Sequence, residues 1–405
     1  MPDKVDITNA KKSYRTRSEG DFPEILPIRF KKMWDLKYGE NPNQHAAIYS
    51  IFQFGTKAFQ ALIDMQSVRS DSKGKGGLSL TNTMDIARAM DTLKYFGGEQ
   101  AVAIMKHNIV AGFSRPHINS QNDPQVKLFR QARDADLRSN FGGTATFTQP
   151  LEMETAQAMY ELKGNSPFFV DVVAAPEFNE GVIGYLENQS QNLRIARFSG
   201  LDNLPRFQGD DTHGLYSIKE IPGGMFGIQD LYLTSIRDPN DLVLRPYVTK
   251  EENQTGINRA PTINEAQDLL TSWWLNITGA RSNGIVAVKN GTTVAMGSGQ
   301  VERVGAVEQA IIKGMQKAMD REDIAYDPLF GIKCYEQLSE NPFRGASVSS
   351  DAFFPFSDSI ERLARVGVTA VIQPYGSMRD NEVIEAANKY NMAMPATLER
   401  CFGHF

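Results

Sequence analysis

Short apolar runs rich in β-branched residues alternate with amphipathic helical segments along most of this chain, and no other feature limits its possible folds as strongly. The run AVAIM at 101–105 predicts a buried strand, and the segment before it, 81–96, has the periodicity of an amphipathic helix. Two more buried strands are expected at 168–176 and 192–200. This alternation predicts an α/β protein in which helices cover a mostly parallel or mixed sheet.

The middle of the chain, about 203–264, differs because Pro, Gly and Asn separate short strands there, as in a connecting segment. Regular order then returns: Asn290-Gly291 predicts a hairpin turn, a helix is expected at 301–320, and a last strand at 392–397. A chain of 405 residues exceeds the usual size of one core, so two α/β units are expected. The predicted division is a polar N-terminal tail at 1–21, a first unit at 22–202, a connecting segment at 203–270 and a second unit at 271–405.

Charge and cysteine usage narrow the function classes. A net charge of −5 argues against a general nucleic-acid or membrane-surface binder, which needs a basic field, but allows a local basic pocket for a phosphorylated small molecule. The two cysteines, Cys334 and Cys401, form no disulfide framework by themselves and suit a reducing compartment. There is no apolar run of about 18 residues and no apolar signal segment, so a cytoplasmic protein is expected.

An apolar run ends abruptly in two titratable side chains, Lys106 and His107. The carboxyl ends of strands are where α/β proteins commonly place ligands. There a neutral imidazole is a usable base, and an ammonium group can stabilise an oxyanion or donate a proton. The alternative is an ordinary strand end with a solvated lysine and a hydrogen-bonded histidine.

Three further stretches have the composition of ligand loops, although each also fits a plain turn or core packing. Lys37 and Tyr38, before Gly39, have the donors for a phosphate. The glycines of RSNFGG at 138–143 allow a ligand to approach the backbone closely. The aromatic and acidic residues of 347–359 suit a flat heterocycle with amino and amide groups.

Several motifs are absent from the sequence. GSGQVERV at 297–304 has Glu302 where a dinucleotide-binding loop needs its third glycine, although helix N-terminal amides and Arg303 remain available there. No His-x-Glu and no Cys-x-x-Cys occurs, which excludes zinc deaminase chemistry by lack of ligands. No P-loop and no Gly-x-Ser-x-Gly elbow is present either.

Taken together and in order, these stretches resemble the transformylase part of the bifunctional purine-biosynthesis enzyme that acts on AICAR (5-aminoimidazole-4-carboxamide ribonucleotide). The resemblance runs from about Trp34 to Phe405. Its motifs are LKYGENPNQ, LSLTN, KHNIVAG, SNFGG, DVVAAP, SNGIVAVKNG, GSGQVERV, SSDAFFPFSD, IQPYGSMRD and the ending RCFGHF.

The resemblance implies a fold and an activity. The fold would be two cytidine-deaminase-like α/β/α three-layer units without zinc, in a homodimer whose subunits share their active sites. The reaction would transfer the formyl group of 10-formyltetrahydrofolate, a co-substrate, to the 5-amino group of AICAR. The products would be FAICAR and tetrahydrofolate, on the route to IMP, with no metal required. Nucleic acid and membranes are not expected partners.

The resemblance also implies roles for individual residues. His107 would accept the proton of the attacking amine, and Lys106 would stabilise the oxyanion or protonate the leaving N10 nitrogen. The residues expected at the reaction centre are Lys106, His107, Asn283 and Arg303. Those expected to contact substrate are Lys37, Tyr38, Gly39, Asn82, Ser139, Phe141, Gly142, Asp171, Phe353, Arg400 and His404. Those expected on the folate side are Phe141, Val304, Phe353, Phe354 and Asp358.

This chain departs from the family pattern at Lys37, Asn43 and Val110, which replace the family's Arg, His and Pro. Lysine keeps the positive charge but loses the bidentate fork of arginine. The cyclohydrolase domain that normally precedes this part is not found, so no IMP cyclohydrolase activity and a separate cyclohydrolase are expected. Two alternatives stay open: a non-catalytic AICAR-binding paralogue, and formyl transfer from a different one-carbon donor.

Overall fold

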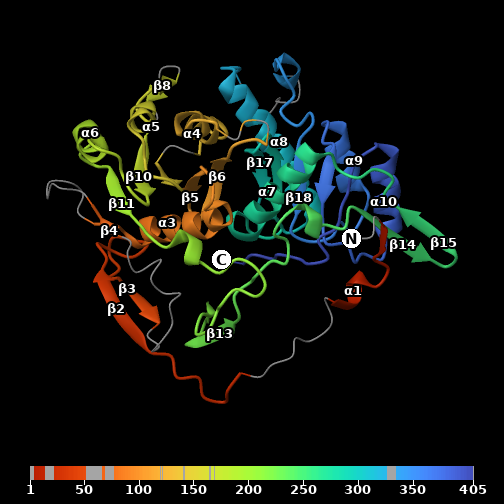
Figure 1. Ribbon diagram of the computed structural model, residues 1–405, viewed down its shortest axis with the longest axis horizontal. Helices are drawn as coiled ribbons and strands as arrows, with labels where there is room; N and C mark the ends of the chain where they lie inside the picture. The colour runs from red at the N-terminus through yellow and green to blue at the C-terminus, as the bar shows by residue number, and fades with distance from the viewer. Residues whose placement is uncertain are drawn as a thin grey trace.

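A ten-stranded mixed sheet forms the centre of the protein (Figure 1) in the order β19-β18-β16-β17-β6-β5-β7-β10-β11-β4. The computed structural model describes residues 4–13, 22–51, 66–68, 77–118, 120, 122–139, 142–163, 166–167, 169–325 and 334–404. The strands from the first half of the chain are β4 (Gln66–Ser67), β5 (Val102–Lys106), β6 (Ile109–Ser114), β7 (Gly143–Phe147), β10 (Val170–Ala175) and β11 (Arg194–Arg197). Those from the second half are β16 (Ile285–Lys289), β17 (Thr292–Gly297), β18 (Ser347–Ser350) and β19 (Ala370–Ile372).

Helices cover both faces of this sheet, so the predicted α/β class is confirmed. Two helices, α3 (Leu80–Leu93) and α7 (Ile263–Gly279), pack on one face and on each other. The helices of the other face are α4 (Gln125–Asp134), α5 (Met153–Ala158), α6 (Val182–Gln189), α8 (Arg303–Arg321), α9 (Asp358–Arg365) and α10 (Asp380–Lys389). The finer prediction, two cytidine-deaminase-like units, stays a prediction.

The alternation of side chains along β5 shows how the sequence produces these layers. Val102 and Ile104 belong to the apolar cluster under α4, whereas Ala103 and Met105 belong to the cluster under α3. All four are fully buried, because a strand with helices on both faces has no solvated side. The cluster under α3 and α7 is continuous across both halves of the sheet, while the other face has two separate clusters.

One sheet joins the two expected α/β units, because β17 pairs antiparallel with β6 at Thr292 and Ser114. The predicted hairpin is confirmed: β16 and β17 flank Asn290 (φ 54°) and Gly291 (φ 74°). The predicted last strand at 392–397 is wrong, since that stretch forms only isolated bridges. Pro395 lies within it, and proline has no N–H to donate to a strand ladder.

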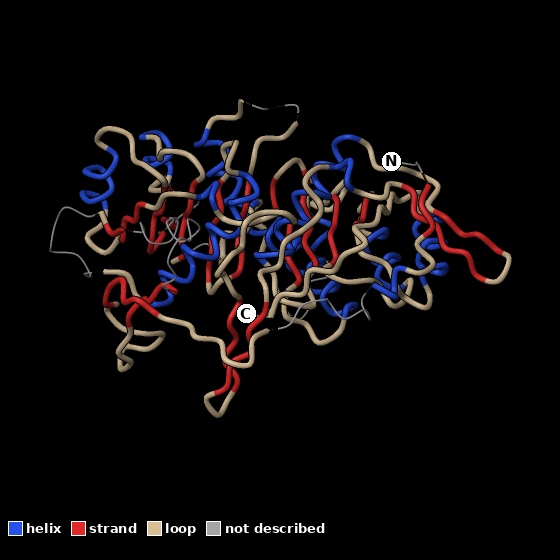
Figure 2. The backbone as a smooth tube through the Cα atoms, turned by 60° about the horizontal axis from the view of Figure 1, so that its bottom comes forward, coloured by secondary structure: helices blue, strands red, loops and turns tan. Residues whose placement is uncertain are grey.

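Smaller elements extend from the main body (Figures 1 and 2). Two antiparallel hairpins are β2 (Phe30–Asp35) with β3 (Ala47–Ile51), and β12 (Ser217–Ile221) with β13 (Met225–Gln229). A separate sheet joins β1 (Lys4–Asp6), β14 (Arg245–Lys250) and β15 (Asn253–Gly256). Further short elements of the described chain are the α-helix α1 (Ala10–Ser13) and the strands β8 (Leu162–Lys163) and β9 (Ser166–Pro167). No helix in the described ranges is long and apolar enough to span a membrane.

Candidate functional site

The strand directions bring most of the predicted site residues to one edge of the large sheet. β5 ends at this edge and β6 begins there, since the two strands are antiparallel. β17 also ends there and β16 begins there, which places Asn283 at this edge. β18 ends there with Asp351 just beyond it. β7 and β10 begin there, next to Gly142 and Asp171.

Lys106 and His107 lie where the sequence predicts them, at the end of a buried strand. Lys106 is the last residue of β5, and His107 and Asn108 form the two-residue turn into β6. Both turn residues have positive φ values, 54° and 61°, as in the hairpin turns whose twist matches that of their strands. His107 is exposed and Lys106 is half-buried. The turn thus holds the imidazole out of the core, one residue after a half-buried lysine.

Asp85 of α3 anchors this turn, a role that no sequence motif predicts. The backbone N–H of Asn108 donates to Asp85 Oδ1 at 2.7 Å. Burial raises the pKa of Asp85, and the hydrogen bonds of the turn and the charge of His107 oppose that rise. The available signal was a carboxylate on the buried face of an amphipathic helix, next to Ile86. Such a group needs a partner, and here the partner is the turn.

A cavity of about 440 Å³ opens beside this turn, between the end of α4 and α8. We name it the Lys106 cavity. It is lined by Lys106, His107, Ile109, Val110, Ala111, Asp136, Arg138, Ser139, Met296, Ser298, Lys313, Gln316 and Lys317. Three predicted site residues therefore share one cavity: Lys106, His107 and Ser139.

Ion pairs hold the basic side of the Lys106 cavity in place. Lys317 Nζ lies 2.9 Å from Asp136 Oδ2, and Arg138 pairs with Asp320. Burial alone would raise the pKa of Asp136, but the Lys317 ammonium and hydrogen bonds from Lys317 and Ser139 keep it below its usual value. Asp136 is therefore an anion at neutral pH.

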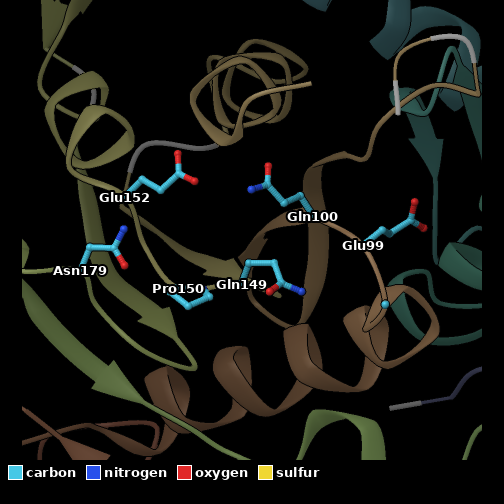
Figure 3. A pocket seen from close by; sticks show the side chains of 7 residues that line it. Glu99, Gln100, Gln149, Pro150, Glu152 and Asn179 are labelled. Carbon is cyan, nitrogen blue, oxygen red and sulfur yellow. The ribbon is translucent and has the colours of Figure 1, made fainter. Parts of the chain in front are cut away.

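A larger polar cavity, about 490 Å³, lies at the opposite edge of the sheet (Figure 3). Glu99 and Gln100 come just before β5 begins, and Gln149 follows the end of β7. Figure 3 also shows Glu152 and Asn179 around this space. None of the predicted site residues lines it, so its size alone does not make it the candidate site.

Arg303 begins α8 and makes a buried ion pair with Asp351. The two side chains are only 6% and 2% exposed, so water contributes little to stabilising either charge. Ser282 Oγ donates to Asp351 Oδ2 at 2.5 Å, and the N–H of Cys401 donates to the backbone oxygen of Asp351 at 3.0 Å. Asp351 therefore connects Arg303 to the C-terminal segment.

Asn283 and the chain end lie around the same pair. The Asn283 side-chain amide donates to the backbone oxygen of Gln300 at 2.8 Å. The N–H of Ser282, next to Asn283, donates to the Gly403 oxygen at 3.0 Å. Arg400 lies over the Phe402 ring, 4.8 Å from its centroid, and Phe402 makes an edge contact with His404. Arg400 and His404 are exposed.

The Lys37–Gly39 loop lies against the start of α3. The backbone N–H of Leu80 donates to the backbone oxygen of Tyr38 at 3.2 Å. Asn82 closes a capping box with Ser79 at this helix start. The predicted contacts from LKYGENPNQ and LSLTN are thus neighbours, one helical turn before Asp85.

The remaining predicted residues lie in varied surroundings. Gly142 is next to Asp171, and a Cβ on Gly142 would lie 3.9 Å from the Asp171 carboxylate. Phe353 and Val304 are half-buried, and Asp358 begins α9.

Phe354 and Phe141 differ from the others. Phe354 is fully buried in the core cluster around α8 and α9, so its placement favours a packing role over the predicted contact with folate. Phe141 is outside the described residues. Among the residues that the structure describes, no group of three or more His, Cys, Asp or Glu side chains is arranged to hold a metal ion.

Comparison with known proteins gives a consistent family. The family described as AICARFT/IMPCHase bienzyme matches residues 6–313. The bifunctional purine biosynthesis protein PurH of Persephonella marina is 32% identical over 383 residues, which cover 95% of this chain and 62% of the relative. That of Caldicellulosiruptor saccharolyticus is 32% identical over 389 residues, covering 96% and 62%. This chain thus spans about three fifths of the length of the curated relatives it matches.

These comparisons overturn one prediction. The motifs predict the transformylase part alone, without IMP cyclohydrolase activity and with a separate cyclohydrolase as pathway partner. The matching family is instead that of the bienzyme, and the relatives are named bifunctional. The prediction failed because the motifs behind it report on one reaction centre and carry no information on a second activity.

Proposed function

Because this chain belongs to the AICARFT/IMPCHase bienzyme family, we propose that it transfers the formyl group of 10-formyltetrahydrofolate to the 5-amino group of AICAR. The products are FAICAR and tetrahydrofolate, a step of purine biosynthesis. The observation that carries the proposal is the Lys106–His107 turn at the mouth of a 440 Å³ cavity, since that volume suits small-molecule substrates.

The chemistry requires a base and a positive charge. The amine of AICAR is conjugated with its ring and is a weak nucleophile, so it must lose a proton as its nitrogen bonds to the formyl carbon. His107 accepts that proton, and the Lys106 ammonium stabilises the tetrahedral oxyanion. The bond between the formyl carbon and N10 then breaks, and Lys106 or the protonated His107 returns a proton to N10. Acid–base catalysis of this kind contributes roughly 10²- to 10⁴-fold in rate.

The other residues hold the two substrates. Lys37, Tyr38 and Arg400 hold the nucleotide, and Asn283 with Arg303 orients the formyl group and the carboxamide. The further contacts proposed for the nucleotide are Gly39, Asn82, Ser139, Phe141, Gly142, Asp171 and His404. The folate ring is placed against Phe353, Phe141, Val304 and Asp358. The Arg303–Asp351 pair supports this arrangement, because it fixes the guanidinium direction at the start of α8.

A homodimer completes the site in this proposal. The Lys37–Gly39 loop lies beside α3 on one face of the sheet, whereas the Lys106 cavity lies between α4 and α8 on the other. A second subunit can bring its own loop to this cavity. Exposed apolar side chains on the projecting hairpins, among them Phe30 and Phe226, support such an interface, since they are 56% and 62% exposed here.

The test is turnover by the purified chain. We expect AICAR and 10-formyltetrahydrofolate to yield FAICAR, identified by mass, with tetrahydrofolate followed by absorbance. AICAR binding without turnover would support the binding paralogue, and turnover with another formyl donor would support the second alternative. The same preparation is supplied with FAICAR, because the family is named for two activities, and IMP formation is measured separately.

A further inference from the structure

We propose that the Lys106 cavity contains a subsite for a multiply charged anion, formed by Arg138, Lys313 and Lys317. This inference rests on the proposed function, since it assigns the anionic group of one of the two substrates to this cavity. It concerns Arg138, just after α4, and the α8 residues Lys313 and Lys317, which have no role in the scheme above.

The cavity has a strong excess of positive charge. Its lining includes the cations Lys106, Arg138, Lys313 and Lys317, and Asp136 is the one carboxylate among the described lining residues. Two cations have acidic partners, Lys317 with Asp136 and Arg138 with Asp320. No carboxylate of the described chain lies within 4.0 Å of Lys313 Nζ, and Lys313 is exposed. The lining of the cavity thus keeps a net positive charge.

The spacing along α8 gathers these charges on one side of the helix. Lys313, Lys317 and Arg321 follow at intervals of four residues, so successive members are neighbours on the helix surface. Burial lowers the pKa of Lys317, and the charges of Lys313 and Arg321 lower it further. Asp136 opposes this effect without removing it. A bound anion would relieve the repulsion, and several charged donors suit an anion with more than one negative oxygen.

The rest of the lining limits the kind of ligand. Ile109, Val110 and Met296 supply apolar surface near the turn, away from the α8 lysines in sequence and on different elements. A ligand with a flat or apolar body and a phosphate or carboxylate group matches this combination. Both substrates have such a shape: AICAR carries a phosphate, and the folate donor carries the carboxylates of its glutamate.

The experiment measures dissociation constants by calorimetry, which needs no turnover. Wild type, Lys313→Ala and Lys313→Arg are each titrated with AICAR and its unphosphorylated nucleoside, and with tetrahydrofolate and tetrahydropteroate, which lacks the glutamate. Lys250→Ala is the matched control, since Lys250 is an exposed lysine on β14. Lys313 is exposed, so its replacement is expected to leave folding intact.

We expect Lys313→Ala to weaken one anionic ligand roughly tenfold, with its uncharged counterpart unchanged and Lys313→Arg close to wild type. Loss for AICAR assigns the subsite to the phosphate, and loss for tetrahydrofolate assigns it to the carboxylates. The subsite is overturned if Lys313→Ala binds each of the four ligands as tightly as wild type does. It is also overturned if the substitution weakens the charged and the uncharged ligands equally. If wild type turns over its substrates but the Lys313 variants bind all ligands normally, only the subsite is refuted. If ligand binding depends on Lys313 but wild type shows no turnover, only the proposed reaction is refuted.

Discussion

The buried pair of Arg303 and Asp351 gives the most quantitative prediction of this structure. The Asp351 side chain accepts hydrogen bonds from Arg303 and Ser282, and its backbone oxygen accepts one from Cys401. Asp351→Ala removes the carboxylate and leaves the Arg303 guanidinium nearly without water, since that side chain is only 6% exposed. An unpaired buried charge of this kind costs about 3–5 kcal/mol in the free energy of unfolding.

The assay is chemical denaturation followed by fluorescence, with a double-mutant cycle to Arg303→Met. The Arg303→Met/Asp351→Ala double variant is expected to be more stable than the sum of the two single effects predicts, because no isolated charge remains. The rate of formyl transfer should fall in all three variants, because each removes Arg303 or the carboxylate that orients it. A loss below about 1 kcal/mol for Asp351→Ala, or strictly additive effects, would show that Arg303 does not need Asp351 to remain charged in the core.

Three further predictions concern the turn, a buried acid and a close glycine. Asp85→Ala removes the acceptor for the backbone N–H of Asn108 in the turn and should lower kcat roughly tenfold. Asp85→Asn keeps an acceptor oxygen and should retain most of the rate. Equal rates for the two variants would contradict this. Burial raises the pKa of Asp380 from 3.8 to about 6, so the free energy of unfolding should fall as pH rises from about 4 to 6. At about 1.4 kcal/mol per pKa unit the change approaches about 3 kcal/mol, and denaturation across this pH range should show a flatter profile for Asp380→Asn. A Cβ on Gly297 would clash with the Ala306 backbone oxygen, so Gly297→Ala should lower the free energy of unfolding by several kcal/mol. Gly184 on α6 has open space around it, so Gly184→Ala should raise the free energy of unfolding by about 0.5–1 kcal/mol. Similar melting temperatures for the two variants would refute this.

Local patterns in the sequence predict the elements that depend on local physics. The run before Lys106 is β5, the periodic segment before it is α3, and Asn290-Gly291 is a hairpin turn. Each has a short-range cause: burial on both faces, helical spacing, or positive φ. The last strand failed where Pro395 removes a donor from the expected ladder.

Long-range pairing has no such local signal. The union of the two halves depends on β17 lying beside β6, where the Phe113 N–H donates to Thr293 Oγ1 at 3.0 Å. Nothing in either short segment identifies the other as its partner, because both are simply apolar strands. The sequence therefore predicts α/β layers but not their single sheet.

The candidate site was predictable to the extent that its residues form sequence motifs. Lys106, His107 and Ser139 share a cavity, as expected of ligand-binding residues. Asp85 and Lys313 were missed, because a helical acid and an exposed helical lysine each look like ordinary helix residues until the fold shows what they face. Phe354 is fully buried, so part of its aromatic motif belongs to the core, and its contact with folate stays a prediction.

The roles of Lys106 and His107 in formyl transfer are tested by measuring the reaction rate of variants of the turn. Rates at saturating AICAR and 10-formyltetrahydrofolate are compared for wild type, Lys106→Ala and His107→Ala, with AICAR binding measured in parallel. His213→Ala is the matched control, because His213 is an exposed histidine outside the Lys106 cavity. We expect at least about a 100-fold loss of rate in both turn variants with binding retained, and no loss in His213→Ala. Near-wild-type rates in either turn variant would contradict it.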